Sequence, residues 1–162
     1  MVIIQHLNFK QMAKEFERKF LLALESIPIP KKHKKTWITQ GYIFADMGKN
    51  IRVRLTKKKS FLCVKFTEGV ITDEFEYKIP QEDALEIYEQ CEWTLEKKRL
   101  SFKCGGVHFD IDTYPNGLVV VETEFDYLTD MLNWEKPSWI GVEVSGKSEY
   151  SNVVLAKQNL KF

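Results

Sequence analysis

The chain has 162 residues, of which 44% are hydrophobic and 29% are charged, and its net charge at pH 7 is +1. This composition is typical of one folded domain with a hydrophobic core, and it excludes a largely disordered chain. A net charge so close to zero gives no general attraction to nucleic acid or to a membrane surface, so we expect neither as a partner.

The first part of the chain predicts short strands separated by turns. Residues 1–11 carry a weak pattern, and we interpret them either as a short helical extension or as an upstream start outside the domain. The stretch FERKFLLAL is the first predicted strand, and a loop with two prolines and a basic cluster follows at residues 27–35. Further strands are predicted at residues 36–44, 51–56, 61–66 and 74–79.

The second part of the chain adds helices to the strands. Residues 80–91 predict a helix, because Pro80 suits its start, acidic residues follow, and an apolar stripe includes Ala84 and Ile87. Strands are predicted at residues 93–103, 107–114 and 117–125, and short helices at residues 126–134 and 149–158. About eight strands joined mostly by short turns indicate a mainly β (α+β) domain, either an antiparallel barrel or a sandwich.

Cysteines and histidines limit the chemistry that we expect. Cys63, Cys91 and Cys104 are odd in number and widely spaced, so they form neither a disulfide framework nor a CxxC metal site. The three histidines make no HExxH motif, which argues against a zinc hydrolase, and we interpret His108 as a surface or edge residue. Because no signal peptide and no apolar run of about 18 residues is visible, we expect a cytoplasmic protein.

Charged residues recur at every second position of several predicted strands. Side chains two residues apart in a strand point the same way, so each such set shares one face. On the first strand this face carries Glu15, Glu17 and Lys19. The other acidic pairs are Glu74/Glu76, Asp110/Asp112 and Glu122/Glu124, and the basic positions are Arg52/Arg54, Lys65 and Lys97/Arg99.

This pattern has two interpretations. In a sandwich the charged faces would meet water, as half-buried antiparallel sheets commonly do. In a barrel they would line the interior, with the apolar faces outside under helices, and an eight-stranded barrel can hold one small ligand. Like charges at alternate positions repel each other and recur in almost every strand, which favours the barrel. Acidic and basic walls together suit a polyphosphate bound with a divalent metal.

The residues also resemble a known family. The stretch EFERKF is similar to the ExExK signature of the CYTH domain, the fold of the triphosphate tunnel metalloenzymes. Later stretches resemble the family's other motifs in the same order, namely ITQGYIF, IRVRL, FLCVKFTEG, DEFEYKIP, LEKKRLSF, FDIDTYPNGLVVVETEF and WIGVEVSGKSEYSN. Each motif is weak alone, but their joint order from about Met12 to Ala156 is highly specific.

The resemblance implies an eight-stranded antiparallel β-barrel, the triphosphate tunnel, with flanking helices, formed as one domain by residues 12–162. It implies that a basic set of side chains clamps the phosphates: Lys19, Arg52, Arg54, Lys65, Lys97 and Arg99. It also implies that an acidic set holds Mg²⁺ or Mn²⁺: Glu15, Glu17, Glu122 and Glu124, with Asp110 or Asp112 assisting.

Three residues are implied at the reacting phosphate. In compact bacterial members of the family, the motif lysine pairs with the QGY tyrosine near the terminal phosphate; here these are Lys19 and Tyr42, and Glu17 is expected to act with them. Glu74 and Glu76 are either tunnel wall or structural partners of the arginines.

The resemblance favours an enzyme that hydrolyses a small-molecule triphosphate, with inorganic tripolyphosphate converted to pyrophosphate and phosphate as the first choice. A class IV adenylyl cyclase, which forms cyclic AMP from ATP, and a thiamine triphosphatase are alternatives with the same fold. A third alternative is a non-catalytic polyphosphate- or nucleotide-binding module, against which the number of carboxylates argues. We expect a monomer or a homodimer.

Overall fold

A computed structural model of the protein describes residues 13–23, 27–69 and 71–162. The predicted extension at residues 1–11 lies outside the described residues. The strands are β1 (Ala13–Leu22), β2 (Lys34–Asp46), β3 (Lys49–Leu55), β4 (Ser60–Glu68), β5 (Ile71–Ile79), β6 (Trp93–Cys104), β7 (Val107–Thr113), β8 (Val119–Phe125) and β9 (Ile140–Glu143). The helices are α1 (Gln81–Glu89), α2 (Leu128–Asn133), the 3-10 helix η1 (Ser148–Tyr150) and α3 (Asn152–Ala156).

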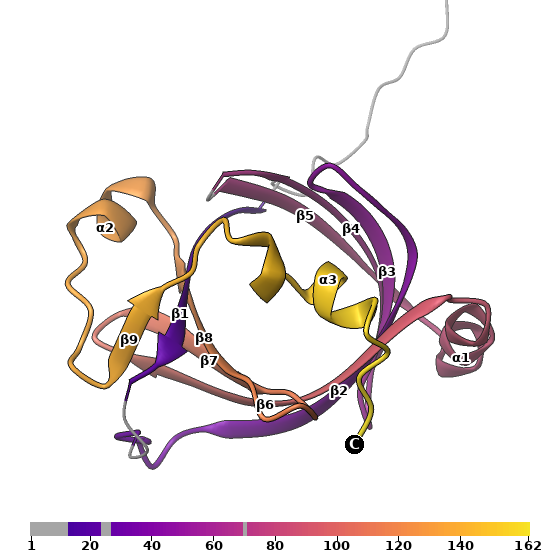
Figure 1. Ribbon diagram of the computed structural model, residues 1–162, viewed down its shortest axis with the longest axis horizontal. Coiled ribbons are helices and arrows are strands. Elements are labelled where there is room, and N and C mark those ends of the chain that lie inside the picture. The colour runs from indigo at the N-terminus through magenta and orange to yellow at the C-terminus, as the bar shows by residue number, and fades with distance from the viewer. Residues whose placement is uncertain (1–12, 24–26, 70) are drawn as a thin grey trace, which may run out of the picture.

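Eight of the strands form a closed antiparallel ring (Figure 1). Their order around the ring is β5, β4, β3, β2, β6, β7, β8 and β1. Strand β1 closes the ring, because its first residues pair with β5 and its later residues pair with β8. The predicted eight-stranded antiparallel architecture is therefore confirmed, and the sandwich alternative is not found.

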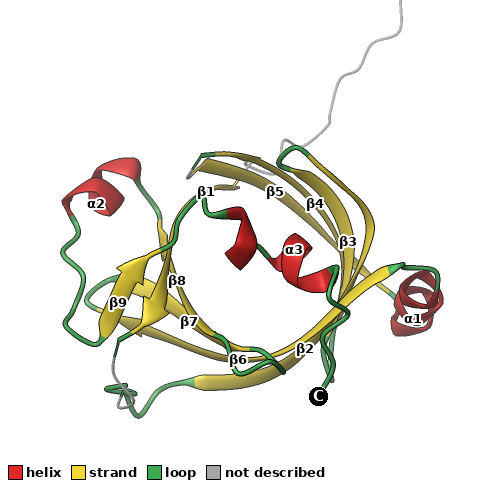
Figure 2. Ribbon diagram, in the orientation of Figure 1, coloured by secondary structure: helices red, strands yellow, loops and turns green. Residues whose placement is uncertain are grey.

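Strand β9 lies outside this ring and extends the sheet beside the second half of β1. The sequence pattern did not predict it, because four residues are too few to show a clear alternation. The predicted helices at residues 80–91, 126–134 and 149–158 correspond to α1, α2 and α3 (Figure 2). None of the helices in the described part of the chain is long and apolar enough to cross a membrane.

The hydrophobic core lies mainly on the outer side of the ring. One cluster packs Phe20, Phe109 and Phe125 against Met131 of α2 and the following Trp139. A second cluster packs α1 against β3. Alternation explains this arrangement: residues such as Phe20, Phe109 and Val53 face outward into these clusters, so their neighbours along the strand must face inward.

The short helix α3 lies across the opening of the ring in Figure 1. Its residues Leu155 and Ala156 are buried against Leu95, Tyr114 and Val120 from the ring. Apolar side chains of α3 thus fill one part of the interior of the ring, and charged side chains line the remainder.

Candidate active site

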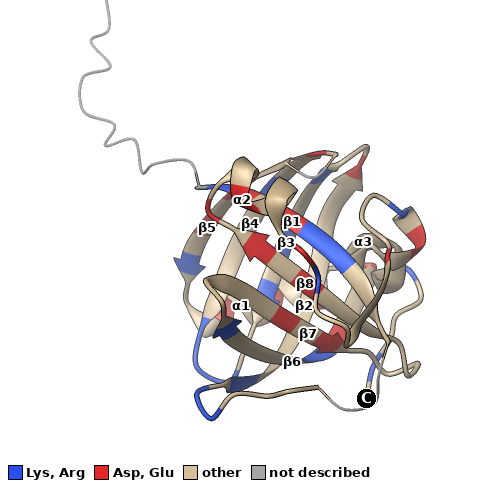
Figure 3. Cartoon of the chain, turned by 90° about the vertical axis from the view of Figure 1, so that its left-hand side faces the viewer, with Lys and Arg blue, Asp and Glu red and all other residues tan. Residues whose placement is uncertain are grey.

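The interior of the ring holds a cavity of about 810 Å³. The predicted site residues that line it are Glu15, Glu17, Lys19, Tyr42, Arg52, Arg54, Lys65, Glu74, Glu76, Lys97, Arg99, Asp110, Glu122 and Glu124. They come from all eight strands of the ring, and acidic and basic positions recur along these strands in Figure 3. Asp112 is the one predicted site residue that is not among the lining residues; it is fully buried behind them.

The tightest charge network in the cavity wall is the Arg99 cluster, which comprises Lys97, Arg99, Asp110, Asp112 and Glu122. The ammonium of Lys97 lies 2.6 Å from a carboxylate oxygen of Asp112. The guanidinium of Arg99 reaches Asp110 and Asp112 at 2.6 Å each and Glu122 at 2.7 Å. Both oxygens of Asp112 accept hydrogen bonds in this network, so Asp112 anchors the two basic side chains.

The electrostatics of the Arg99 cluster follow from its burial. Burial, and then the charge of Arg99, lowers the pKa of Lys97 to about 8. Burial alone would raise the pKa of Glu122, but Lys19, Lys97 and Arg99 hold it well below its usual range. The carboxylates of this cluster are thus paired with cations of the protein itself.

Two arginines of β3 form ion pairs with two glutamates of β5. Arg52 lies 2.9 Å from Glu74, and Arg54 forms an ion pair with Glu76. Burial would raise the pKa of Glu74, but the charges of Arg52 and Lys65 bring it down to about 2. The Nε atom of Arg52 is buried and has no hydrogen-bond partner among the described residues.

Three other carboxylates form a contrasting group, the acidic corner, made of Glu15, Glu17 and Glu124. Glu17 and Glu124 are direct cross-strand neighbours on β1 and β8, where like charges repel each other. The nearest ammonium to the corner on one side is that of Lys65, at 3.8 Å from Glu15 and 3.5 Å from Glu17. No ion pair to Glu124 is found in the part of the chain that the structure describes.

The acidic corner is consequently poor in positive charge. Burial, and then the charge of Glu74, raises the pKa of Glu15 to about 8. Burial, with the charges of Asp110 and Glu17, also raises the pKa of Glu124. These side chains can therefore lose their protons readily only when a cation joins them.

Lys19 and Tyr42 lie between the walls. The ammonium of Lys19 is 2.9 Å from Glu122 and 3.8 Å from Glu17, so it joins the Arg99 cluster to the acidic corner. Tyr42 is 3% exposed, and its hydroxyl accepts a hydrogen bond from the amide of Gln40. Burial raises the pKa of Tyr42, although the positive charge of Arg52 opposes this shift.

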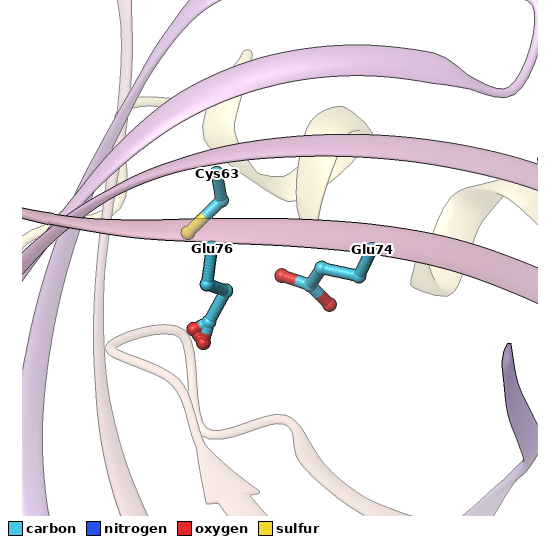
Figure 4. Close-up of side chains that lie close together, drawn as sticks. All are labelled: Cys63, Glu74 and Glu76. Atoms are coloured by element: carbon cyan, nitrogen blue, oxygen red, sulfur yellow. The ribbon is translucent and has the colours of Figure 1, made fainter. Parts of the chain in front are cut away.

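One further group of possible metal ligands comprises Cys63, Glu74 and Glu76 (Figure 4), with one ligand atom from each within 4.8 Å of the others. Both carboxylates are already bound to Arg52 and Arg54. Burial raises the pKa of the Cys63 thiol, whereas a metal needs the thiolate. This group therefore fits a structural role better than a metal site.

Two inward-facing positions escaped the sequence analysis. His108, at the start of β7, is 32% exposed, as expected for an edge residue, but it also lines the cavity and its Nε2 atom lies 3.1 Å from Asp110. The signal was available, because His108 continues the alternation of Asp110 and Asp112 along β7. Gln40 also lines the cavity, and being uncharged it does not belong to the charge pattern.

Comparisons with known proteins agree with this geometry. No protein-family model matches the chain. The inorganic triphosphatase of Acetivibrio thermocellus is 37% identical over 156 residues, which cover 93% of this chain and 97% of that protein.

Solved structures share the fold. The crystal structure of the inorganic triphosphatase NE1496 matches with a TM-score of 0.63 and 28% identity, over 88% of this chain and 94% of that one. A candidate adenylate cyclase from Vibrio parahaemolyticus matches with a TM-score of 0.54 and 15% identity, over 75% and 82% of the two chains. From the ring of strands, the charged interior and these relatives together, we conclude that this protein belongs to the CYTH domain, or triphosphate tunnel metalloenzyme, family.

Proposed function

We propose that this protein hydrolyses inorganic tripolyphosphate to pyrophosphate and phosphate inside the ring, with the help of a divalent cation. The observation that carries the proposal is the coexistence, in one cavity, of basic side chains from four strands with a carboxylate corner whose ammonium contacts are no shorter than 3.5 Å among the described residues. A metal–triphosphate complex has the complementary charges. The inorganic triphosphatase that covers nearly the whole chain supports this choice of substrate.

The divalent cation, Mg²⁺ or Mn²⁺, would be held by the acidic corner. Carboxylate oxygens are the ligands that both ions prefer, and Glu15, Glu17 and Glu124 are less tightly paired than the other carboxylates, since the ammonium contacts to Glu15 and Glu17 are 3.5–3.8 Å long. Bound there, the cation would polarise phosphoryl oxygens and neutralise part of their charge.

The phosphates would replace carboxylates of the cavity wall as the hydrogen-bond partners of the arginines. Arg52, Arg54 and Arg99 now donate to carboxylates, and phosphoryl oxygens can accept the same hydrogen bonds. In that exchange Glu122 and Asp110 would be released towards the acidic corner and could complete the coordination of the metal, whereas Asp112 would keep Lys97 and Arg99 in place. Lys65 would contribute a further point charge to the phosphates.

The hydrolytic step needs little covalent chemistry from the protein. A water oxygen attacks the terminal phosphorus, the bond to the bridging oxygen breaks, and pyrophosphate leaves. Glu17 would orient this water and take its proton, while Lys19 and Tyr42 would donate to the terminal phosphoryl group. The basic side chains neutralise the charge that develops on the leaving pyrophosphate.

One assay separates this function from its alternatives. The purified protein is incubated with Mg²⁺ or Mn²⁺ and, in turn, with tripolyphosphate, ATP and thiamine triphosphate, and phosphate, pyrophosphate and cyclic AMP are measured. We expect phosphate and pyrophosphate from tripolyphosphate, and none after chelation of the metal. Cyclic AMP from ATP would overturn the proposal in favour of a cyclase, and binding of triphosphates without turnover would favour the binding module.

A further inference from the structure

The inward face of β2 differs from the rest of the cavity wall because it carries uncharged polar groups. Gln40 is 1% exposed and Tyr42 is 3% exposed, and both line the cavity. Gly41, between them, faces outward, where an added Cβ would lie 2.8 Å from Sγ of Cys91 and 3.0 Å from the ring of Tyr88. This close packing against α1 and the residue that follows it holds the strand, and with it the two inward side chains, in place.

A single hydrogen bond joins these two side chains. The Nε2 atom of Gln40 donates to the hydroxyl oxygen of Tyr42 over 2.9 Å. A tyrosine hydroxyl can also donate its own proton, and no acceptor for that proton is found among the described residues. Since burial raises the pKa of Tyr42, the hydroxyl keeps this proton at neutral pH.

The cross-strand neighbour of Tyr42 on β3 is positively charged. Arg52 is its direct partner on β3, and its charge acts on the tyrosine oxygen. An amide N–H and a guanidinium both favour the lone pairs of the hydroxyl oxygen, so both direct the O–H bond away from themselves.

We infer that Gln40 is a positioning residue, which occupies the acceptor side of the Tyr42 hydroxyl and so directs the tyrosine proton to a phosphoryl oxygen of the substrate in the cavity. This inference rests on the proposed function. It assigns a role to an uncharged residue of the QGY stretch, alongside the tyrosine that donates and the glycine that allows the strand to pack against α1. A hydroxyl held in this way gives the phosphate a donor without reorientation at the moment of reaction.

A double-mutant cycle tests the inference. Gln40→Met keeps the length and bulk of the side chain but removes the donor, and Tyr42→Phe removes the hydroxyl. For tripolyphosphate hydrolysis with Mg²⁺, we expect each change to lower kcat/KM about tenfold, the effect of one hydrogen bond. In the double variant, Gln40→Met should cost nothing beyond Tyr42→Phe. An equal loss from Gln40→Met in both backgrounds, or no loss in either, would overturn the inference.

Gln40→Glu tests the direction of the hydrogen bond. A carboxylate at this position would accept the tyrosine proton and turn it away from the substrate, so a larger loss than that of Gln40→Met is expected. Activity equal to that of the unchanged protein would show that residue 40 is an acceptor, which contradicts the inference. Ile38→Val, on the same inward face, is the matched control for packing; it should leave kcat and KM unchanged and lower the unfolding temperature only by the small amount expected for one buried CH2 group.

The same variants separate this inference from the proposed function. Calorimetric binding of tripolyphosphate to metal-free protein is measured for the same cycle. Binding without hydrolysis would contradict the proposed function, while coupling between residues 40 and 42 in binding would still support the inference. Hydrolysis without such coupling would contradict the inference alone.

Discussion

The Arg99 cluster and the acidic corner are built from the same alternation of side chains, yet their charges are balanced differently. In the Arg99 cluster every ion pair is 2.6 or 2.7 Å long. In the acidic corner the contacts to Lys65 are 3.5 and 3.8 Å, and Glu124 has no ion pair among the described residues.

The order of the strands explains this difference. The basic strand β6 lies next to β7, so Arg99 is the direct partner of Asp112. Strands β1 and β8 both carry carboxylates, and their register sets Glu17 against Glu124. The protein thus neutralises one group of carboxylates internally, and we propose that it leaves the other for a divalent cation. Variants in the first group should affect stability, and variants in the second should affect metal-dependent activity.

The largest effect on stability is expected in the Arg99 cluster. Asp112→Ala would leave Lys97 and Arg99 buried without their shared counter-charge, which costs about 3–5 kcal/mol of unfolding free energy for a broken buried pair. Urea denaturation measures the loss. A change below about 1 kcal/mol would mean that the cluster is not the anchor that its geometry suggests.

The largest effect on activity without loss of the fold is expected in the acidic corner. Glu17→Ala should lower metal-dependent hydrolysis of tripolyphosphate at least about 100-fold, because it removes a side chain that we propose to bind the metal and to orient water. The unfolding temperature of the metal-free variant should not fall, since the relieved repulsion with Glu124 offsets the loss of the long contacts to Lys65 and Lys19. Glu86→Gln, on the exposed face of α1, is the acidic control. Full activity of Glu17→Ala would remove the corner from the mechanism.

The pH dependence of stability should have opposite signs in the two regions. The pKa of Glu15 is about 8 in the folded protein, against an ordinary value of 4.5, so its contribution to stability is full below pH 4.5 and is lost as the pH rises to 8. The pKa of Glu74 is about 2, so its contribution is present above pH 4.5 and is lost as the pH falls towards 2.

Thermal unfolding of metal-free protein checks both signs. Glu15→Gln should flatten the decline of a few degrees expected between pH 5 and pH 8, and Mn²⁺ at pH 8 should restore the stability of the unchanged protein. Glu74→Gln should flatten the acid limb instead. If Glu15→Gln left the pH dependence of the unfolding temperature above pH 5 unaltered, a raised pKa of Glu15 would be contradicted.

The smallest effect is expected for an acidic residue outside the cavity. Glu143 forms an ion pair of 2.7 Å with Arg18 on the outer side of β1 and is partly exposed to solvent. Glu143→Ala should therefore cost less than about 1 kcal/mol of unfolding free energy and leave kcat unchanged. An activity loss comparable to that of Glu17→Ala would remove the distinction between inward and outward carboxylates.

Alternation made the inward-facing charges predictable, because it does not depend on which strands are neighbours. Glu15, Glu17 and Lys19 had to share a face whatever lay beside them. The pairing of charges was not predictable in this way, since it depends on strand order and register. The sequence could not show that Asp112 would be bound behind Arg99, or that Glu17 would face Glu124. The inward positions of His108 and Gln40 follow from the two-residue period of their strands, but not from the pattern of like charges, because neither carries such a charge.

Titration of metal-free protein with Mn²⁺, followed by the electron paramagnetic resonance signal of the free ion, tests the central claim most directly. The unchanged protein and Glu76→Gln, which alters the arginine-paired wall, should both bind the ion. A variant with Glu17→Gln and Glu124→Gln should lose this binding while its unfolding temperature is maintained. Retained binding in that variant, or lost binding in Glu76→Gln, would place the metal outside the acidic corner and contradict the account.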